Sequence, residues 1–181
     1  MNYKNAKWNE VSTSYLKTFN NEVPIYSPSI YREYRGEIFT TFHSVDHPAN
    51  NIICKDAKIH NRFSKSYANV LRGLHYDAKT WKLVQAVVGD IYLVVLDVRA
   101  ESSTYGLWES YIISEKTRDQ VLIPPGFANG HYALTDCMFH YTMFYPGEYI
   151  DETQQEVIKW NDSRFNIEWP TTTPTLQNRD R

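Results

Sequence analysis

The chain has 181 residues, of which 22% are charged, and its formal net charge at pH 7 is -2. This length allows one domain with a sizeable core and is too short for two ordinary domains. Because no basic block occurs, the charge pattern excludes a protein that binds the phosphate backbone of nucleic acid.

Residues 1–22 are polar, with aromatic side chains scattered among Asn, Lys and Ser. They show no helical or strand periodicity, so we predict an N-terminal arm followed by a single domain over residues 23–181. The first residues lack the charged and then apolar pattern of a signal peptide, and no apolar run is long enough to span a membrane. We therefore expect a soluble protein of the cytoplasm.

After the arm, short runs rich in Val, Ile, Tyr, Phe and Thr alternate with turn residues, which is typical of an all-β fold. A strand is predicted near Val23–Tyr26, a second at 35–42, and a loop at 43–56. Gly89-Asp90 between two long apolar runs is the clearest hairpin signal. Further strands are predicted at about 58–66, 69–76, 82–88, 90–98, 108–113, 119–123, 130–134 and 138–145.

The end of the chain changes character. A short edge strand is predicted at 158–162, and the prolines within 169–174 favour extended chain. The polar terminus that includes Asp180 is expected to fray. The number of short strands, together with the absence of a long helical period, predicts a double-sheet jelly roll or barrel.

The stretch Val70–Tyr76 places a cation and an imidazole, Arg72 and His75, on an otherwise apolar strand. A lone histidine in a strand is most often a hydrogen-bonded core or rim residue, so this pair does not specify a site by itself. Motifs in other segments of the chain are needed to assign a role to Arg72 and His75.

Nine short motifs follow one another along the chain: Arg35-Gly36, Leu71–Tyr76, Lys82–Val84, Gly89–Ile91, Asp97–Arg99, Ser103–Gly106, Ile123–Ala128, Trp160–Asp162 and Trp169-Pro170. In this order, and over residues 23–181, the chain resembles the nucleotide-sugar 3,5-epimerases, a family of cupin-fold enzymes typified by dTDP-4-dehydrorhamnose 3,5-epimerase. The resemblance implies a cupin-type jelly roll that inverts C3, or C3 and C5, of a 4-keto sugar on a nucleoside diphosphate.

The resemblance also implies roles for individual residues. His75 is the general base, Asp180 is the carboxylate that orients it, and Tyr141 is the acid on a late strand. Lys82 and Arg72 stabilise the developing oxyanion. A ketone at C4 makes the hydrogens on C3 and C5 acidic without a metal or a redox group, so we expect no cofactor and no metal ligands.

Substrate-binding residues follow from the same resemblance. Arg35 and Arg62 lie where the family gathers nucleotide-contacting groups, and a guanidinium pairs well with phosphate. Early Arg-Gly residues often serve the neighbouring subunit's site, so Arg35 implies a homodimer. Tyr149 ends a Pro-Gly-Glu-Tyr segment that contributes to the same binding region.

The chain departs from the family at Asn129, where a histidine is common, so a second basic group is either missing or has moved to His131. These departures resemble the subgroup that acts on GDP-linked 4-keto heptoses in capsular polysaccharide synthesis. We therefore expect a GDP-linked 4-keto-6-deoxy-heptose as substrate, with a dTDP-linked sugar as the other possibility.

Four alternatives stay open. The enzyme could invert C3 alone, or it could be a sugar 3,4-ketoisomerase. A non-catalytic sugar-binding cupin is also compatible, because a fold does not fix a function. A metal-dependent oxygenase or isomerase would need a His-x-His pair, which His75-Tyr76-Asp77 breaks.

Overall fold

The computed structural model describes residues 10–151 and 153–181, and residues 1–9 of the expected arm lie outside the described residues. Within the described part of the chain, no helix has the length and apolar character needed to cross a membrane. In chain order the elements are β1 (Val11–Tyr15), η2 (Lys17–Phe19), β2 (Pro24–Pro28), β3 (Tyr31–Glu33), β4 (Gly36–Ile38), η3 (Pro48–Asn51), β5 (Lys58–Ser66), β6 (Leu71–Tyr76), β7 (Trp81–Val88), β8 (Asp90–Asp97), β9 (Trp108–Ser114), β10 (Gln120–Ile123), β11 (Phe127–Ala133), β12 (Cys137–Tyr145), β13 (Glu156–Val157) and η4 (Asn178–Asp180).

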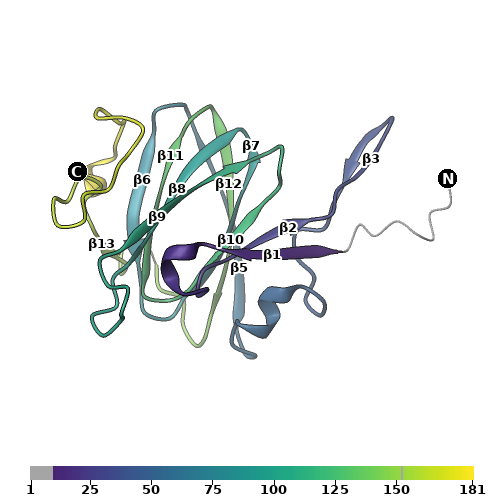
Figure 1. Cartoon of the computed structure of the whole chain (residues 1–181), viewed down its shortest axis with the longest axis horizontal. Coiled ribbons are helices and arrows are strands. Elements are labelled where there is room, and N and C mark those ends of the chain that lie inside the picture. Colours follow the sequence, from purple (N-terminus) through teal and green to yellow (C-terminus); the bar gives the residue numbers. More distant parts are fainter. Residues whose placement is uncertain (1–9, 152) are drawn as a thin grey trace.

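The strands form two sheets that pack against each other (Figure 1). One has the order β1-β2-β10-β7-β12-β5 and the other β13-β6-β11-β8-β9, and the paired strands of both are antiparallel. The small hairpin of β3 and β4 projects away from both sheets. This arrangement confirms the predicted all-β, cupin-type jelly roll.

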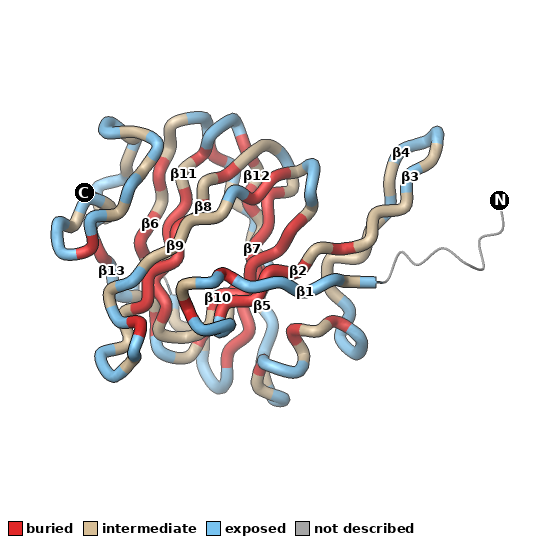
Figure 2. The backbone as a smooth tube through the Cα atoms, in the orientation of Figure 1, coloured by how far each residue is buried: buried red, intermediate tan, exposed pale blue. Residues whose placement is uncertain are grey.

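The main core lies between the two sheets, where buried strand residues run through the molecule (Figure 2). The reason is the two-residue period of a strand, which sends alternate side chains to opposite faces. On β12, Phe139 and Tyr141 point inward, whereas Phe144 joins a separate cluster on the outer face beneath the loop that carries η3. The eight strands predicted between residues 58 and 145 all occur, with ends that match within three residues.

The expectation of an arm over residues 1–22 is wrong for its described part. Val11–Tyr15 pairs along its whole length with β2. Leu16 and Phe19 are 1% and 0% exposed and belong to the main core, where Phe19 meets Phe127 edge to face. Two apolar side chains on a single short turn are too few to give a periodic signal, so only the packed fold reveals them.

Two predicted strands were also misplaced. Within the segment 35–42 the strand covers Gly36–Ile38, the three residues that pair with β3. In the tail the strand is Glu156–Val157, before the predicted 158–162. The chain turns at Trp160, whose carbonyl accepts a 2.7 Å hydrogen bond from Trp169 Nε1, so the tail folds back over the five-stranded sheet.

Candidate active site

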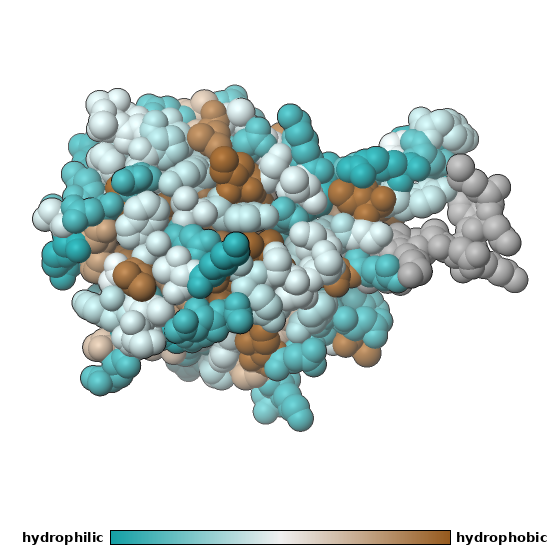
Figure 3. All heavy atoms as spheres, in the orientation of Figure 1, coloured by the Kyte–Doolittle hydropathy of each residue, from teal (hydrophilic) through white to brown (hydrophobic). Residues whose placement is uncertain are grey.

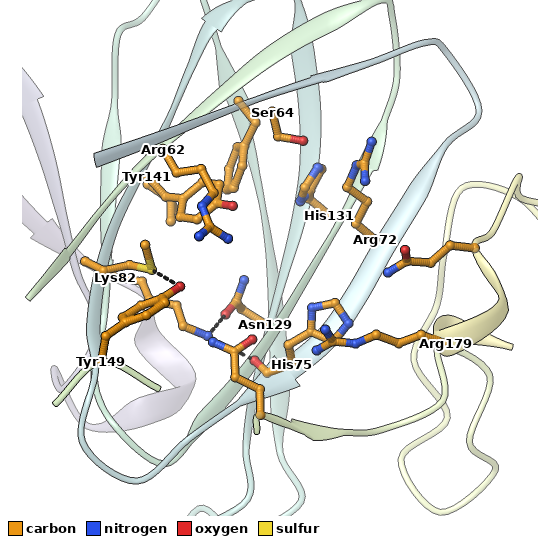
Figure 4. A pocket seen from close by; sticks show the side chains of 15 residues that line it. Arg62, Ser64, Arg72, His75, Lys82, Asn129, His131, Tyr141, Tyr149 and Arg179 are labelled. Carbon is orange, nitrogen blue, oxygen red and sulfur yellow. Dashed lines mark hydrogen bonds between the residues drawn. The ribbon is translucent and has the colours of Figure 1, made fainter. Parts of the chain in front are cut away.

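One cavity of about 160 Å³ opens between the two sheets, walled by β5, β6, β7, β11 and β12 and by the C-terminal segment (Figure 4). Eight of the ten predicted site residues line it: Arg62, Arg72, His75, Lys82, Asn129, His131, Tyr141 and Tyr149. Residues from strands far apart in the sequence therefore meet in one place.

Arg72 and His75 reach the same cavity although they are three residues apart on β6. A regular strand would send them to opposite faces. Two irregularities, one in the pairing of β6 and one in its backbone, accompany the placement of both side chains on the same face. The pairing of β6 with β11 shifts register between Asn129 and His131, and Gly73 has a φ of +112°. A Cβ at Gly73 would lie 2.6 Å from the Cα of Gly130, so only glycine fits this conformation and this approach.

His75 is paired with Asp180, and its Nε2 lies 2.7 Å from the Asp180 Oδ1. The second carboxylate oxygen accepts a 3.4 Å hydrogen bond from the Gly73 N–H. Burial pushes the pKa of Asp180 upward, but the hydrogen bond and charge of His75 and the Gly73 N–H hold it below its ordinary value. An ionised Asp180 keeps the proton on Nε2 and leaves Nδ1 of His75 as the nitrogen with a lone pair.

The expectation that the terminus around Asp180 frays is wrong, because Asp180 is 0% exposed. The tail is fastened to the start of β6 by backbone hydrogen bonds: Leu71 donates to the Thr175 carbonyl over 3.0 Å, and Thr175 donates to the Asn69 carbonyl over 2.8 Å. A parallel bridge between Val70 and Thr175 lies at the same place. These contacts hold the final residues at the cavity.

Lys82 enters the cavity from β7 and is 7% exposed. Its ammonium donates to Asn129 Oδ1 over 3.1 Å and to the His75 carbonyl over 3.3 Å. Burial lowers the pKa of Lys82 to about 8; the charge of Arg179 acts in the same direction, and that of Asp77 opposes it. A buried cation that can lose its proton near neutral pH therefore stands beside His75.

Tyr141 stands in the other wall. It belongs to β12 of the six-stranded sheet, whereas His75 belongs to β6 of the five-stranded sheet, so the phenol and the imidazole approach the cavity from different sheets. The Tyr141 ring packs against Phe139, with 5.6 Å between centroids. A ring-shaped molecule bound in the cavity would have the His75 imidazole in one wall and the Tyr141 hydroxyl in another.

His131 does not supply a second basic group. Its ring stacks on Phe139 with centroids 4.3 Å apart, and among the described residues its Nε2 has no hydrogen-bond partner. Burial lowers the pKa of His131 to about 3, and the nearby charges of Arg72 and His75 act in the same direction. The imidazole is therefore neutral at physiological pH and can act only as a neutral hydrogen-bonding group.

The cavity is positively charged. Arg62, Arg72 and Lys82 line it together with Arg179, and among the described residues none of those that line it is acidic. Nε and Nη2 of Arg179 are buried and have no partner within the described residues. Sequence reasoning missed Arg179, although it directly precedes Asp180 and could have been inferred from that position.

Arg35 lies outside this cavity. It sits at the tip of the β3–β4 hairpin with its side chain 63% exposed and paired with Glu33. Ser64, Gln155 and Gln177 line the cavity without having been predicted. No group of three His, Cys, Asp or Glu side chains able to hold a metal ion occurs in residues 10–151 and 153–181.

The chain is similar in sequence to a known protein family and to individual members of it. The family described as dTDP-4-dehydrorhamnose 3,5-epimerase matches residues 17–181. The protein of that name from Shigella flexneri is 33% identical over 175 residues, which cover 91% of each chain.

Solved structures agree with this match. A dTDP-6-deoxy-D-glucose-3,5-epimerase from Legionella pneumophila, in complex with dTDP-4-keto-L-rhamnose, superposes with a TM-score of 0.83 at 27% identity and covers 94% of this chain and 90% of its own. A dTDP-4-dehydrorhamnose 3,5-epimerase from Bacillus anthracis with TDP and PPi bound has a TM-score of 0.84 at 26% identity and covers 95% and 97%.

Proposed function

This chain belongs to the dTDP-4-dehydrorhamnose 3,5-epimerase family, and on that premise we propose that its cavity inverts C3 and C5 of a nucleoside-diphosphate-linked 4-keto sugar through an enolate. The single observation that carries the proposal is the His75–Asp180 pair, which shares one cavity with the Lys82 ammonium and the Tyr141 hydroxyl. Base, acid and oxyanion donor are the three groups that such a reaction needs.

In the proposed reaction, His75 Nδ1 removes the proton from the ring carbon, and the electron pair of the C–H bond moves onto the C4 oxygen as an enolate. Asp180 keeps the imidazole in the required tautomer and stabilises the imidazolium that forms. Tyr141 then gives its phenolic proton to the opposite face of the same carbon. The electron pair returns from oxygen to carbon, and the configuration is inverted.

Lys82 is proposed to stabilise the enolate. The negative charge develops on the C4 oxygen, and the buried ammonium lies beside His75. A well-placed donor to an oxyanion in a site shielded from water is typically worth about 3 to 4 kcal/mol of barrier. The charge of Lys82 therefore contributes to the rate rather than only to binding.

Arg62 and Arg179 are proposed to hold the diphosphate, together with Arg72, which we assign to the diphosphate in place of the oxyanion role that the resemblance implied. Arg72 is braced by hydrogen bonds from its Nε to Ser66 Oγ over 3.0 Å and from its Nη2 to the Lys65 carbonyl over 3.4 Å. A guanidinium fixed in this way loses little freedom when it meets a phosphate oxygen. Asn129, His131 and Tyr149 are proposed to contact the sugar and the nucleoside.

The nucleotide and the sugar form the finer part of the proposal. The names of the relatives support a dTDP-linked 4-keto-6-deoxy sugar. A GDP-linked 4-keto-6-deoxy-heptose of capsular polysaccharide synthesis is the second candidate, favoured by Asn129 and His131, at which the chain departs from the family pattern. Inversion of C5 after C3 is also part of this finer proposal.

One experiment tests these assignments. The protein is incubated in deuterated water with dTDP- and GDP-linked 4-keto sugars, and deuterium at C3 and C5 is read by NMR and mass spectrometry. We expect label at both carbons with the preferred nucleotide. His75→Asn should reduce the exchange rate by a factor of about 100 or more, because the base is lost.

The matched control is His43→Asn, which changes an exposed histidine in the loop before η3 and should exchange at the wild-type rate. Label at C3 alone would identify a C3 epimerase. Absence of label with every sugar would favour the non-catalytic sugar-binding cupin, and full exchange by His75→Asn would remove His75 from the role of base.

We further propose that the protein is a homodimer in which the β3–β4 hairpin of each subunit reaches its partner. Tyr34 and Ile38 on the hairpin are 94% and 59% exposed, and β5 at the sheet edge exposes Ile59 and Phe63 by 53% and 60%. Apolar residues form separate surface patches, one of them beside the projecting hairpin (Figure 3). Arg35 at its tip could then serve the partner's cavity.

A further inference from the structure

The contact between Lys82 and Asn129 has a definite direction. An ammonium can only donate hydrogen bonds, so the atom of the Asn129 carboxamide that lies 3.1 Å from Lys82 Nζ must be the oxygen. The amide nitrogen is therefore turned away from Lys82, and Figure 4 shows it directed into the cavity. The identity of the partner thus removes the usual ambiguity between amide oxygen and nitrogen.

This contact joins the two sheets at the reaction centre. Asn129 lies on β11 directly opposite His75 on β6, and both belong to the five-stranded sheet. Lys82 comes from β7 of the other sheet. Its long side chain ends between two acceptors of the five-stranded sheet, Asn129 Oδ1 and the His75 carbonyl. The direction of the third N–H is fixed once these two bonds are made.

The burial of Lys82 makes its hydrogen bond to Asn129 important for the charge of the ammonium. The side chain is 7% exposed, and its ammonium donates to two neutral oxygens, Asn129 Oδ1 and the His75 carbonyl. Burial and the charge of Arg179 lower the pKa of Lys82, whereas the charge of Asp77 raises it. The two oxygens act with Asp77 in favouring the charged form. Removal of one of them would loosen the ammonium and also promote loss of its proton.

We propose that Asn129 is a positioning residue whose carboxamide oxygen holds the Lys82 ammonium beside His75, so that the remaining N–H is aimed at the C4 oxygen of the substrate. This inference rests on the proposed function, because the C4 oxygen carries charge only in an enolate. Asn129 acts through Lys82 here, so its substitution changes the protonation of Lys82 as well as the rate.

The test is the pH dependence of deuterium exchange at C3 in wild type, Asn129→Asp and Asn129→Leu. Wild-type exchange should fall above about pH 8, where Lys82 loses its proton. A carboxylate at position 129 favours the ammonium and should move this alkaline fall upward by about one to three pH units. Leucine removes the acceptor and should move the fall to lower pH.

The matched control is Asn61→Asp, the same substitution on β5, where Asn61 is exposed and accepts a hydrogen bond from Thr142. Its alkaline fall should coincide with that of wild type. A merely structural role for Asn129 would change the maximal rate of its variants but leave the position of the alkaline fall unchanged, and that result would overturn the inference.

A second measurement separates this inference from the proposed function. The Lys82 side-chain signal, identified by its loss in Lys82→Arg, is titrated by NMR in the free protein. Its midpoint should rise in Asn129→Asp and fall in Asn129→Leu. Since no substrate is present, equal midpoints in all three proteins would refute the coupling even if exchange occurs. Shifted midpoints without exchange by wild type would instead refute the proposed function.

Discussion

Single residues in the cavity owe their properties to their surroundings. The same imidazole group occurs in His75 and His131, both on the five-stranded sheet. His75 is hydrogen-bonded to an ionised carboxylate and is 20% exposed, whereas His131 is stacked on Phe139 and buried. The first arrangement orients the His75 ring, and the second lowers the pKa of His131 and keeps its ring neutral. Residue type alone therefore does not assign a role.

Tyr141 offers the sharpest prediction for one residue. Tyr141→Phe removes the proposed acid but leaves the base, so deuterium should enter C3 from the His75 side with retained configuration. Net inversion should fall by a factor of about 100 or more. Mass spectrometry measures the label, and NMR coupling constants report the configuration.

Tyr132→Phe is the control for this substitution, since its hydroxyl donates to Asn69 Oδ1 on the outer side of β11. It should label and invert at wild-type rates. If Tyr141→Phe inverts C3 as fast as wild type, another group must return the proton.

Among the structural elements, the C-terminal segment and the β3–β4 hairpin differ most from expectation. The segment carries Arg179 to the cavity and Asp180 to His75, and it is tied to β6, although its sequence resembles a frayed end. The hairpin carries Arg35 away from the cavity of its own chain. One element therefore completes the local site, while the other presents its residues outward.

The hairpin gives a prediction at the scale of an element. Ile38→Asp places a charge on its 59% exposed apolar side chain, and the dimer should dissociate because a carboxylate cannot be buried without a partner. Sedimentation velocity and light scattering measure the change.

Ile112→Asp on β9, which is 56% exposed in wild type, is the control and should leave the assembly unchanged. A wild-type protein that is monomeric at micromolar concentration would contradict the proposed dimer and the role of Arg35 in it.

For the whole molecule, the buried neutral His131 links stability to pH. Its pKa is lowered from 6.5 to about 3 in the folded state, so between these values the unfolded chain binds a proton that the folded chain does not. Acidification below pH 6.5 therefore favours unfolding, by about 1.4 kcal/mol for each pH unit from this one group.

His131→Phe keeps a ring against Phe139 and removes the titrating group. Its free energy of unfolding should fall less steeply than that of wild type between pH 6.5 and about 4.5. Urea unfolding at several pH values measures both slopes. Parallel slopes would mean that His131 does not titrate as described, whatever the difference in absolute stability.

The sequence by itself determined the strands from β5 to β12, because the two-residue alternation of apolar and polar side chains is a local property. The resemblance carried by the ordered motifs also indicated His75, Lys82 and Tyr141. Each motif, like each strand, consists of residues close together in the chain.

Only the tertiary structure decided how these residues work together. It brought Asp180 to His75 across 105 positions, placed Arg72 and His75 on one side of β6, and aimed the Lys82 ammonium at Asn129. It also buried His131 as a neutral ring. The physical reason is that pKa values and long-range hydrogen bonds depend on which groups pack around a side chain, and that packing is set by the pairing of distant strands rather than by neighbours in sequence.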